Sequence, residues 1–478
     1  MKSRYFSPLL FVLLLSSCNE ALIEKPLDRV SPNQFFNSDN EAISAVNGVY
    51  SRLTTQFGVE GSIDLGYWTH LGTDLALPTG GREANYIAHS YTLSASNTSN
   101  LADLWRYLYR VIGDANLVIN RVGQSTKISA PIRQRVVGEA LFLRAYAYYW
   151  LTIMWGDVPF WLDELNIEEV GGAIPRTSVS QIRTSMVTDL LKAANDLPST
   201  YADADKGRAT KWAAKMLLCK YFLWQNDWNA VKTTASDIID NSPHALQKNF
   251  ADIFGVKNEY NPELIWEIDF VQDVFPSILS SRYVPRQIDE PAVPGFALTG
   301  FGLITSAKEF VASFDTRDQR LALYNWNGNG SIKTKFSYTT KFIDWAAPRS
   351  NSGVNTLIFR LADAYLMLAE AENEIGGPSA LAYTRINTIR SRAGLPPLQG
   401  LSKEEFRLAI MNERKWELAF EYDRRWDLVR WGKLVDAVKQ MTTSNPQGVT
   451  NIKPHHVLFP IPPQEIGKNS ALTQNPGY

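Results

Sequence analysis

Residues 357–395 have the sequence LIFRLADAYLMLAEAENEIGGPSALAYTRINTIRSRAGL, and this stretch decides the fold. In its first half, small and aliphatic residues recur at spacings of three and four, which places on one helical face Leu357, Leu361, Ala364, Leu368, Ala371 and Ile375. The opposite face is expected to carry the charged residues Arg360, Asp363, Glu370 and Glu372. Gly376, Gly377 and Pro378 then end this helix and start a second one, because glycine suits a helix C-terminus and proline a first turn. The pattern predicts a helical hairpin.

Two more helices are expected after this hairpin. The first opens with Ser402-x-x-Glu405, the pattern of a capping box, and continues to Phe420, and the second covers residues 426–435. Helical pairs of this size bury a full face only by stacking on similar pairs. The same unit recurs upstream, since the offsets of Ala364, Leu368 and Ala380 are repeated in Ala214, Leu218 and Ala230. A weaker third copy, inside a helix expected over residues 101–121, contains Trp105, Tyr109, Gly113-Asp114 and Leu117.

The repeats predict an all-α dominated fold, a tetratricopeptide-like superhelix of helical pairs with irregular, partly β insertions. The scaffold is expected at about residues 101–241 and 357–440, and the insertions at about 54–100 and 242–356, where the helical period disappears. In the second insertion, residues 264–270 are predicted as a strand. Residues 332–342 alternate with period two after the turn residues Asn327 to Gly330. Long irregular insertions are frequent places for ligand binding.

Composition narrows the classes of partner. The chain has 478 residues, with 48 Lys and Arg against 49 Asp and Glu, and therefore a formal net charge of −1. The sequence contains no long run of like-charged residues that could bind along a phosphate backbone, so nucleic acid is not expected as a partner. Cys219 lies in an apolar helix pattern and is expected to be a buried small residue rather than a nucleophile.

The N-terminus has the pattern of a bacterial lipoprotein. Lys2 and Arg4 precede an apolar run over residues 9–15, and Ser16 and Ser17 precede Cys18. Residues 15–18, LSSC, resemble a lipobox, which implies that residues 1–17 are a signal peptide, removed before Cys18, whose thiol is then acylated. The apolar run is too short to span a bilayer, whereas several acyl chains on one residue anchor it firmly. Residues 18–30 are predicted to be a lipid-anchored tether.

Sequence blocks along the whole chain resemble the SusD/RagB family of surface lipoproteins, which bind nutrient glycans for uptake across the outer membrane. The blocks are LRAY (143–146), WGDVP (155–159), NPELIW (261–266), INTIRSRAGLP (386–396), ERKWEL (413–418), RWDLVRW (425–431), FPIP (459–462) and NPGY (475–478). The resemblance implies one SusD-like domain over residues 31–478, lipid-anchored in the outer membrane and facing the cell exterior. It also implies a partner, a SusC-like TonB-dependent transporter that the lipoprotein covers like a lid.

Aromatic residues in the two irregular regions are the candidate ligand contacts. Sugar rings expose C–H faces that pack on flat aromatic rings, and the aromatic candidates are Trp68, Tyr283, Trp326 and Trp345. Polar neighbours that can bond to sugar hydroxyl groups are Arg282, Asn325, Asn327 and Asp344. The expected ligand is an oligosaccharide or polysaccharide, whose identity the sequence does not specify, and peptide cargo remains open.

Three carboxylates allow an alternative class of function. Glu413, Glu417 and Glu421 lie four residues apart on one helical face, and paired carboxylates are what a glycoside hydrolase requires. Arg414, Arg424 and Arg425 lie close to them in sequence, and neighbouring guanidinium groups favour the ionised carboxylate rather than a general acid. We therefore expect a structural ion-pair network.

No catalytic residue, metal site or cofactor is predicted. His455 and His456 are adjacent, but no third ligand stands nearby to complete a zinc site, so a solvated or packed pair is expected. Glycan binding without catalysis is the predicted function. The alternatives are a surface glycan hydrolase and a repeat scaffold that binds only protein or peptide ligands.

Overall fold

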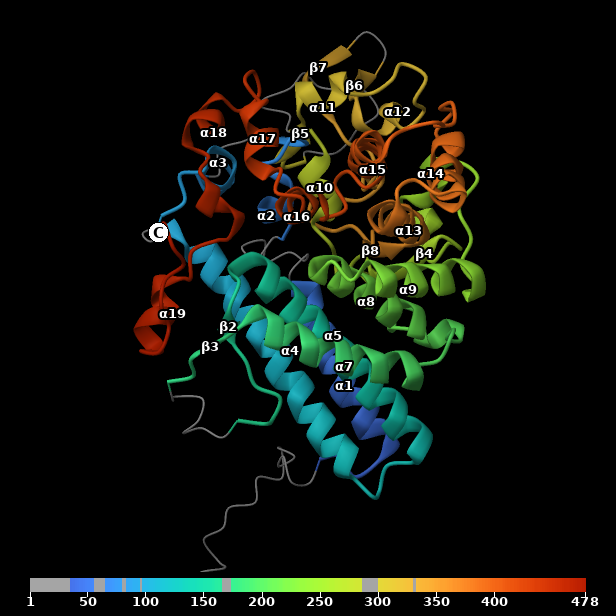
Figure 1. The fold of residues 1–478 in the computed structure, drawn as a ribbon. Helices are drawn as coiled ribbons and strands as arrows, with labels where there is room; N and C mark the ends of the chain where they lie inside the picture. The colour runs from blue at the N-terminus through green and yellow to red at the C-terminus, as the bar shows by residue number, and fades with distance from the viewer. Residues whose placement is uncertain are drawn as a thin grey trace, which may run out of the picture.

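The computed structural model describes residues 35–55, 65–79, 83–94, 97–165, 173–285, 300–329 and 332–478. The predicted signal peptide, Cys18 and the tether lie outside the described residues. Long helices form the scaffold: α1 (Asp39–Thr55), α4 (Ser99–Gln124), α5 (Ala130–Trp155), α7 (Val179–Asp196), α8 (Lys211–Gln225), α9 (Trp228–Asn241), α13 (Leu361–Gly376) and α14 (Ala380–Arg392). Each packs against the next in this order (Figure 1). The predicted helical superhelix is confirmed.

The helical pairs α8–α9 and α13–α14 are the two units whose repeated offsets the sequence shows. In α8–α9, Asp227 caps α9 by accepting a hydrogen bond from the backbone N–H of Ala230, and Asn226 ends α8 in the left-handed conformation. Ser379 caps α14 in the same way, by accepting from Ala382 N–H. The weaker third copy belongs to α4, which runs unbroken through Gly113 and pairs with α5. Side chains at the turns therefore define where each pair bends.

The first turn expected of α13 is instead a strand. Leu357 lies in β8 (Thr356–Arg360), which pairs antiparallel with β4 (Leu264–Ile268), within the predicted 264–270 strand. The expected polar face of α13 is also buried, Asp363 and Glu370 being only 3% exposed. Both carboxylates are paired, Asp363 with Lys220 and Arg414, and Glu370 with Arg430. Periodicity places these charges on one helical face, but it does not detect the ion partners from distant segments that allow this face to be buried.

Both insertions contribute to one four-stranded sheet, in the order β1-β5-β7-β6. β1 (Ala76–Pro78) comes from the first insertion, and the second supplies β5 (Ile304–Ser306), β6 (Trp326–Asn329) and β7 (Ile332–Tyr338). The expectation of a wholly irregular 54–100 region is wrong, because α2 (Leu65–His70) and α3 (Glu83–Ser90) also form there. The sheet lies at the end of the molecule away from α1 and α4 (Figure 1).

Shorter elements complete the fold. They are β2 (Val158–Pro159), β3 (Arg176–Thr177), α10 (Leu279–Tyr283), α11 (Lys308–Ala312), α12 (Leu321–Tyr324), α15 (Lys403–Glu417), α16 (Arg424–Arg430), α17 (Leu434–Lys439), α18 (Pro446–Asn451) and α19 (Pro463–Lys468). The capping box of Ser402 and Glu405 is confirmed at the start of α15. α15 ends before Phe420, and the predicted fourth helix divides into α16 and α17 around Gly432, whose φ is 67°.

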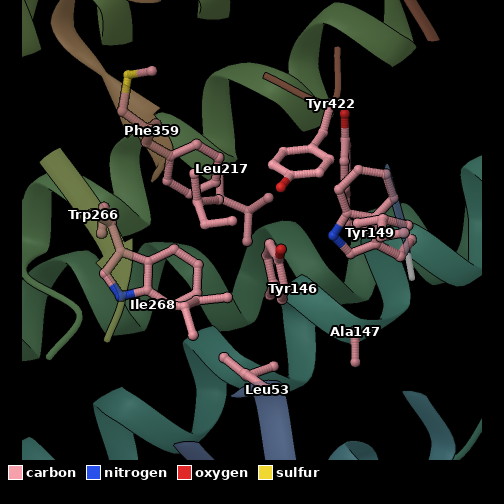
Figure 2. Close-up of a cluster of buried hydrophobic side chains, with 14 of the residues drawn as sticks. Leu53, Tyr146, Ala147, Tyr149, Leu217, Trp266, Ile268, Phe359 and Tyr422 are labelled. Carbon is pink, nitrogen blue, oxygen red and sulfur yellow. The ribbon is translucent and has the colours of Figure 1, made fainter. Parts of the chain in front are cut away.

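The core is centred on α5, in which every residue from Val136 to Trp155 is buried. Figure 2 shows its Tyr146 in one buried cluster with Trp266 of β4 and Phe359 of β8; the ring centroids of Tyr146 and Trp266 are 5.2 Å apart, and those of Trp266 and Phe359 are 5.8 Å apart. Scaffold and insertions thus share one core. Cys219 is buried, as expected. Among the described helices, none is long and apolar enough to span a membrane.

Candidate functional site

Three of the predicted ligand contacts lie in the interior. Trp68, on the fully buried helix α2, is 3% exposed and packs edge-on against Phe459 at 5.4 Å between ring centroids. Tyr283 and Arg282, both on α10, are 0% exposed. The guanidinium of Arg282 lies over the ring of Tyr67, 5.5 Å from its centroid. In this conformation a bound sugar reaches none of the three, so their assignment to a ligand site is contradicted by their burial.

The other two aromatic candidates form a pair at the surface. Trp326 begins β6, and Trp345 follows the chain segment that leaves β7. Their ring centroids are 5.5 Å apart with planes inclined by 53°, and Trp345 is 38% exposed. Trp326 is half-buried and rests edge-on against the buried ring of Tyr338, its cross-strand neighbour. The core therefore supports Trp326 from below, and Trp326 in turn supports the exposed ring of Trp345.

The three remaining polar candidates are held near this pair. Asn327 is exposed on β6, next to Trp326. Asn325 accepts a hydrogen bond from the Ser337 hydroxyl at 2.7 Å. Asp344 accepts one from the Ser352 hydroxyl at 3.0 Å, while its backbone N–H donates to the Ser280 hydroxyl at 2.8 Å. We call Asn325, Trp326, Asn327, Asp344 and Trp345 the tryptophan-pair site.

Sequence reasoning missed the serines that orient this site. Ser280 and Ser352 are buried and lie far from each other in sequence, yet both bond to Asp344. They leave Asp344 half-exposed in a fixed orientation, with carboxylate lone pairs left over to accept further hydrogen bonds. No sequence pattern marks such positioning serines, because they are adjacent only in the folded chain.

The three glutamates of the hydrolase alternative are in the interior. Glu413 and Glu417 are 0% and Glu421 is 4% exposed. The expected ion-pair network is confirmed, but the cations that pair with these glutamates come from distant segments, whereas Arg414 pairs with Asp363 and Asp427 and Arg424 with Asp74. The cations that pair with the glutamates are Arg320, Lys341, Arg360, Arg390 and Arg392. No substrate can reach these carboxylates, so this arrangement is not a glycosidase site.

The electrostatics of this network stabilise the charged carboxylate. Burial alone raises the pKa of Glu417, but the charges of Arg392, Arg360 and Arg320 outweigh burial and place that pKa below its ordinary value. In the same network burial lowers the pKa of Lys341 to about 8, against the opposing charge of Glu421. Lys341 belongs to the predicted period-two segment 332–342 and is only 1% exposed.

The adjacent histidines pack against each other and against Tyr478. Their ring centroids are 4.2 Å apart, and Nδ1 of the buried His456 accepts a hydrogen bond from the Lys453 backbone N–H at 2.9 Å. Within the described ranges, no group of three or more His, Cys, Asp or Glu side chains is arranged to hold a metal ion.

Two family models match the chain. The SusD family model covers residues 322–478, and a model described as "Starch-binding associating with outer membrane" covers residues 68–223. SusD-like protein P25 of Formosa agariphila is 35% identical to this chain, over 97% of each protein. Starch-binding protein SusD of Bacteroides thetaiotaomicron is 23% identical over the full length of both.

Solved structures share the fold. A SusD homolog from Bacteroides thetaiotaomicron superposes with a TM-score of 0.80 at 24% identity, covering 94% of this chain and 99% of that one. Surface glycan-binding protein A from the same organism, in complex with laminarihexaose, superposes with a TM-score of 0.78 at 21% identity, covering 93% and 100%. Together with the full-length match to P25, these likenesses show that the chain belongs to the SusD family.

Proposed function

We propose that this protein binds oligosaccharides at the tryptophan-pair site. The observation that carries the proposal is the inclined Trp326–Trp345 pair, which presents an exposed indole face beside hydrogen-bonding side chains. A pyranose ring has C–H groups that pack on an indole and hydroxyl groups that bond to amides and carboxylates. Relatives whose names refer to starch and laminarin binding support this class of ligand.

The shape of the site suggests a chain of sugars rather than a single ring. Two indoles inclined by 53° offer surfaces in different directions, which suits a curved oligosaccharide that contacts each with a different unit. An open surface site buries only part of such a ligand, so we expect an affinity between about millimolar and micromolar.

The proposed cellular role adds a membrane anchor and a transporter. Cys18 would carry acyl chains that hold the protein in the outer membrane, facing the cell exterior. A SusC-like TonB-dependent transporter would receive the captured oligosaccharide, and closure against it would cover the free side of the ligand. The lipobox pattern and the family model that refers to the outer membrane support this role.

Binding without bond cleavage fits the chemistry of the site. A hydrolase needs two accessible carboxylates across the scissile bond, and the tryptophan-pair site contains one, Asp344. Incubation of the protein with a bound polysaccharide, followed by chromatography, should return the polysaccharide unchanged. Release of shorter products that depends on Asp344 would support the hydrolase alternative.

The test of ligand class is a glycan array with the full mature chain. Retention of at least one oligosaccharide is expected, with loss of signal for Trp345→Ala and no loss for Trp228→Ala. Trp228 is a suitable control because it is a half-buried indole on the scaffold helix α9, outside the tryptophan-pair site. A protein that retains no glycan but copurifies with a large barrel would favour the protein-binding alternative.

A further inference from the structure

An aromatic cavity lies on another part of the molecule than the tryptophan-pair site. It has a volume of about 540 Å³ and is bounded by α4, the segment that follows β2, and α19. Figure 1 shows these elements beside one another, well away from β6 and β7. The volume falls in the usual range of about 300–1,000 Å³ for small-molecule sites.

Stacked aromatic rings form one wall of this cavity. Tyr109 of α4 and Trp161 are parallel to within 9°, with ring centroids 5.0 Å apart. The Tyr109 hydroxyl donates a hydrogen bond to the Pro159 carbonyl at 2.8 Å, and Trp105 packs against Tyr109 at 5.2 Å. The rings are therefore fixed in position before any ligand arrives.

Buried polar side chains hold the segment that carries Trp161. The Trp161 carbonyl accepts hydrogen bonds from the Tyr148 hydroxyl at 3.1 Å and from the Asn116 amide at 3.4 Å. Asn116 also donates to the Asp163 carbonyl at 3.1 Å, and Arg144 donates to the Leu162 carbonyl at 3.0 Å. All three anchoring side chains are buried: Tyr148 and Asn116 are 0% exposed, and Arg144 is 4% exposed. Burying an amide and a guanidinium costs free energy unless they are hydrogen-bonded, and here their hydrogen bonds fix the 159–164 segment in position.

Two charged side chains at the cavity are left for a ligand. Arg121 pairs with Glu164, and Glu465 pairs with Arg106 and Lys468. In contrast, neither the Arg110 guanidinium nor the Asp163 carboxylate bonds to any side chain in the part of the chain that the structure describes. One donor group and one acceptor group, beside an aromatic wall, form a set that recognises neutral hydroxyl groups rather than a net charge.

We propose that this cavity is a second carbohydrate site, which takes one or two neutral pyranose rings of gluco configuration. Equatorial hydroxyl groups leave both faces of a gluco ring covered by C–H groups, so one face can pack on Trp161 while ring hydroxyls bond to Arg110 and Asp163. The ligand class rests on the proposed function, but the site does not share a residue with the tryptophan-pair site. A second site would hold a neighbouring part of a long polysaccharide and increase the effective concentration at the first.

The test uses the full mature chain, labelled with fluorinated tryptophan, and the disaccharides maltose, cellobiose and laminaribiose. The Trp161 resonance is assigned from its absence in Trp161→Phe. In a background of Trp326→Ala and Trp345→Ala, at least one disaccharide is expected to shift the Trp161 resonance in a saturable manner. Adding Arg110→Ala should weaken that binding about tenfold, since it removes a charged hydrogen-bond donor without removing a contact that holds the fold. Lys439→Ala, an exposed cation on α17, is the control and should change nothing.

The outcomes separate the two sites. No shift of Trp161 with any of the three disaccharides, or an affinity that Arg110→Ala leaves unchanged, overturns the second site. Loss of longer oligosaccharides with Trp326→Ala and Trp345→Ala still supports the tryptophan-pair site in that case. If only the Trp161 resonance responds and those two substitutions affect no glycan, the tryptophan-pair site is wrong and the second site stands.

Discussion

Replacing Glu417 by Gln removes one negative charge from the centre of the buried ion network. One carboxylate oxygen lies 2.5 Å from the Arg360 guanidinium and also contacts Arg392, while the other lies 2.9 Å from Arg320. The side chain is 0% exposed, so no water can replace the lost interactions. Glutamine keeps the volume but turns an N–H₂ group towards a guanidinium, which leaves positive charge uncompensated.

The expected loss is large because the partners stay buried. Removing one partner of a buried ion pair typically lowers the unfolding free energy by about 3–5 kcal/mol. With a urea dependence of about 3 kcal/mol per M, the midpoint of unfolding at pH 7 should fall by about 1 M or more. The folded-state pKa of Glu417 lies below its ordinary value of 4.5, because its three arginines outweigh burial. This stabilisation is therefore present above about pH 4.5 and is lost as the pH falls through the folded pKa.

The matched control is Glu404→Gln on the same helix, whose side chain is 77% exposed. Its unfolding free energy should stay within about 0.5 kcal/mol of the wild type. Urea unfolding followed by tryptophan fluorescence measures both variants. Equal midpoints for Glu417→Gln and Glu404→Gln would refute the view that the buried network holds α15 to the rest of the protein.

Three further predictions concern positions outside the Glu417 network. Burial raises the pKa of Glu267 to about 8, with Glu259 and Asp269 adding to the effect. The folded carboxyl therefore stays protonated while the unfolded one ionises, and the unfolding free energy of the wild type falls as the pH rises from about 4.5 to 8. Glu267→Gln should gain stability relative to the wild type across that window, and a constant difference would contradict this. Trp68→Ala should lower the unfolding free energy by about 3–5 kcal/mol and leave the glycan affinity of the folded protein unchanged, as titration calorimetry can check. Gly207→Ala should lower the melting temperature, because φ is 87° there and the new Cβ would lie 1.8 Å from an Asp269 carboxylate oxygen; an unchanged melting temperature would mean that this contact relaxes freely.

The helical scaffold could be predicted from the sequence because its signals are local. The spacing of Ala364 and Leu368, the capping box at Ser402 and the repeated offsets at Ala214 depend only on near neighbours in the chain. The strand β8 could not be predicted in this way. Leu357 continues the hydrophobic period of the helix that follows it, and only pairing with the distant β4 makes residues 356–360 a strand.

The candidate site was predicted in part, for a related reason. Gly, Ser and Thr around Trp68 suggested an exposed loop, whereas the segment folds as a short helix enclosed by the core. Trp326 and Trp345 come from a region of similar composition and do reach the surface. Composition cannot separate the two cases, because burial of a loop aromatic depends on which distant segments cover it.

The most direct test of the glycan-binding account is the affinity of the double variant Trp326→Ala with Trp345→Ala. Titration calorimetry with an oligosaccharide that the wild type retains should show at least about a tenfold weaker affinity, because both stacking surfaces are removed. The melting temperature should fall by only a few degrees, since Trp345 is exposed and Trp326 half-buried. An unchanged affinity in the folded double variant would contradict the assignment of this pair as the site where the protein holds its glycan.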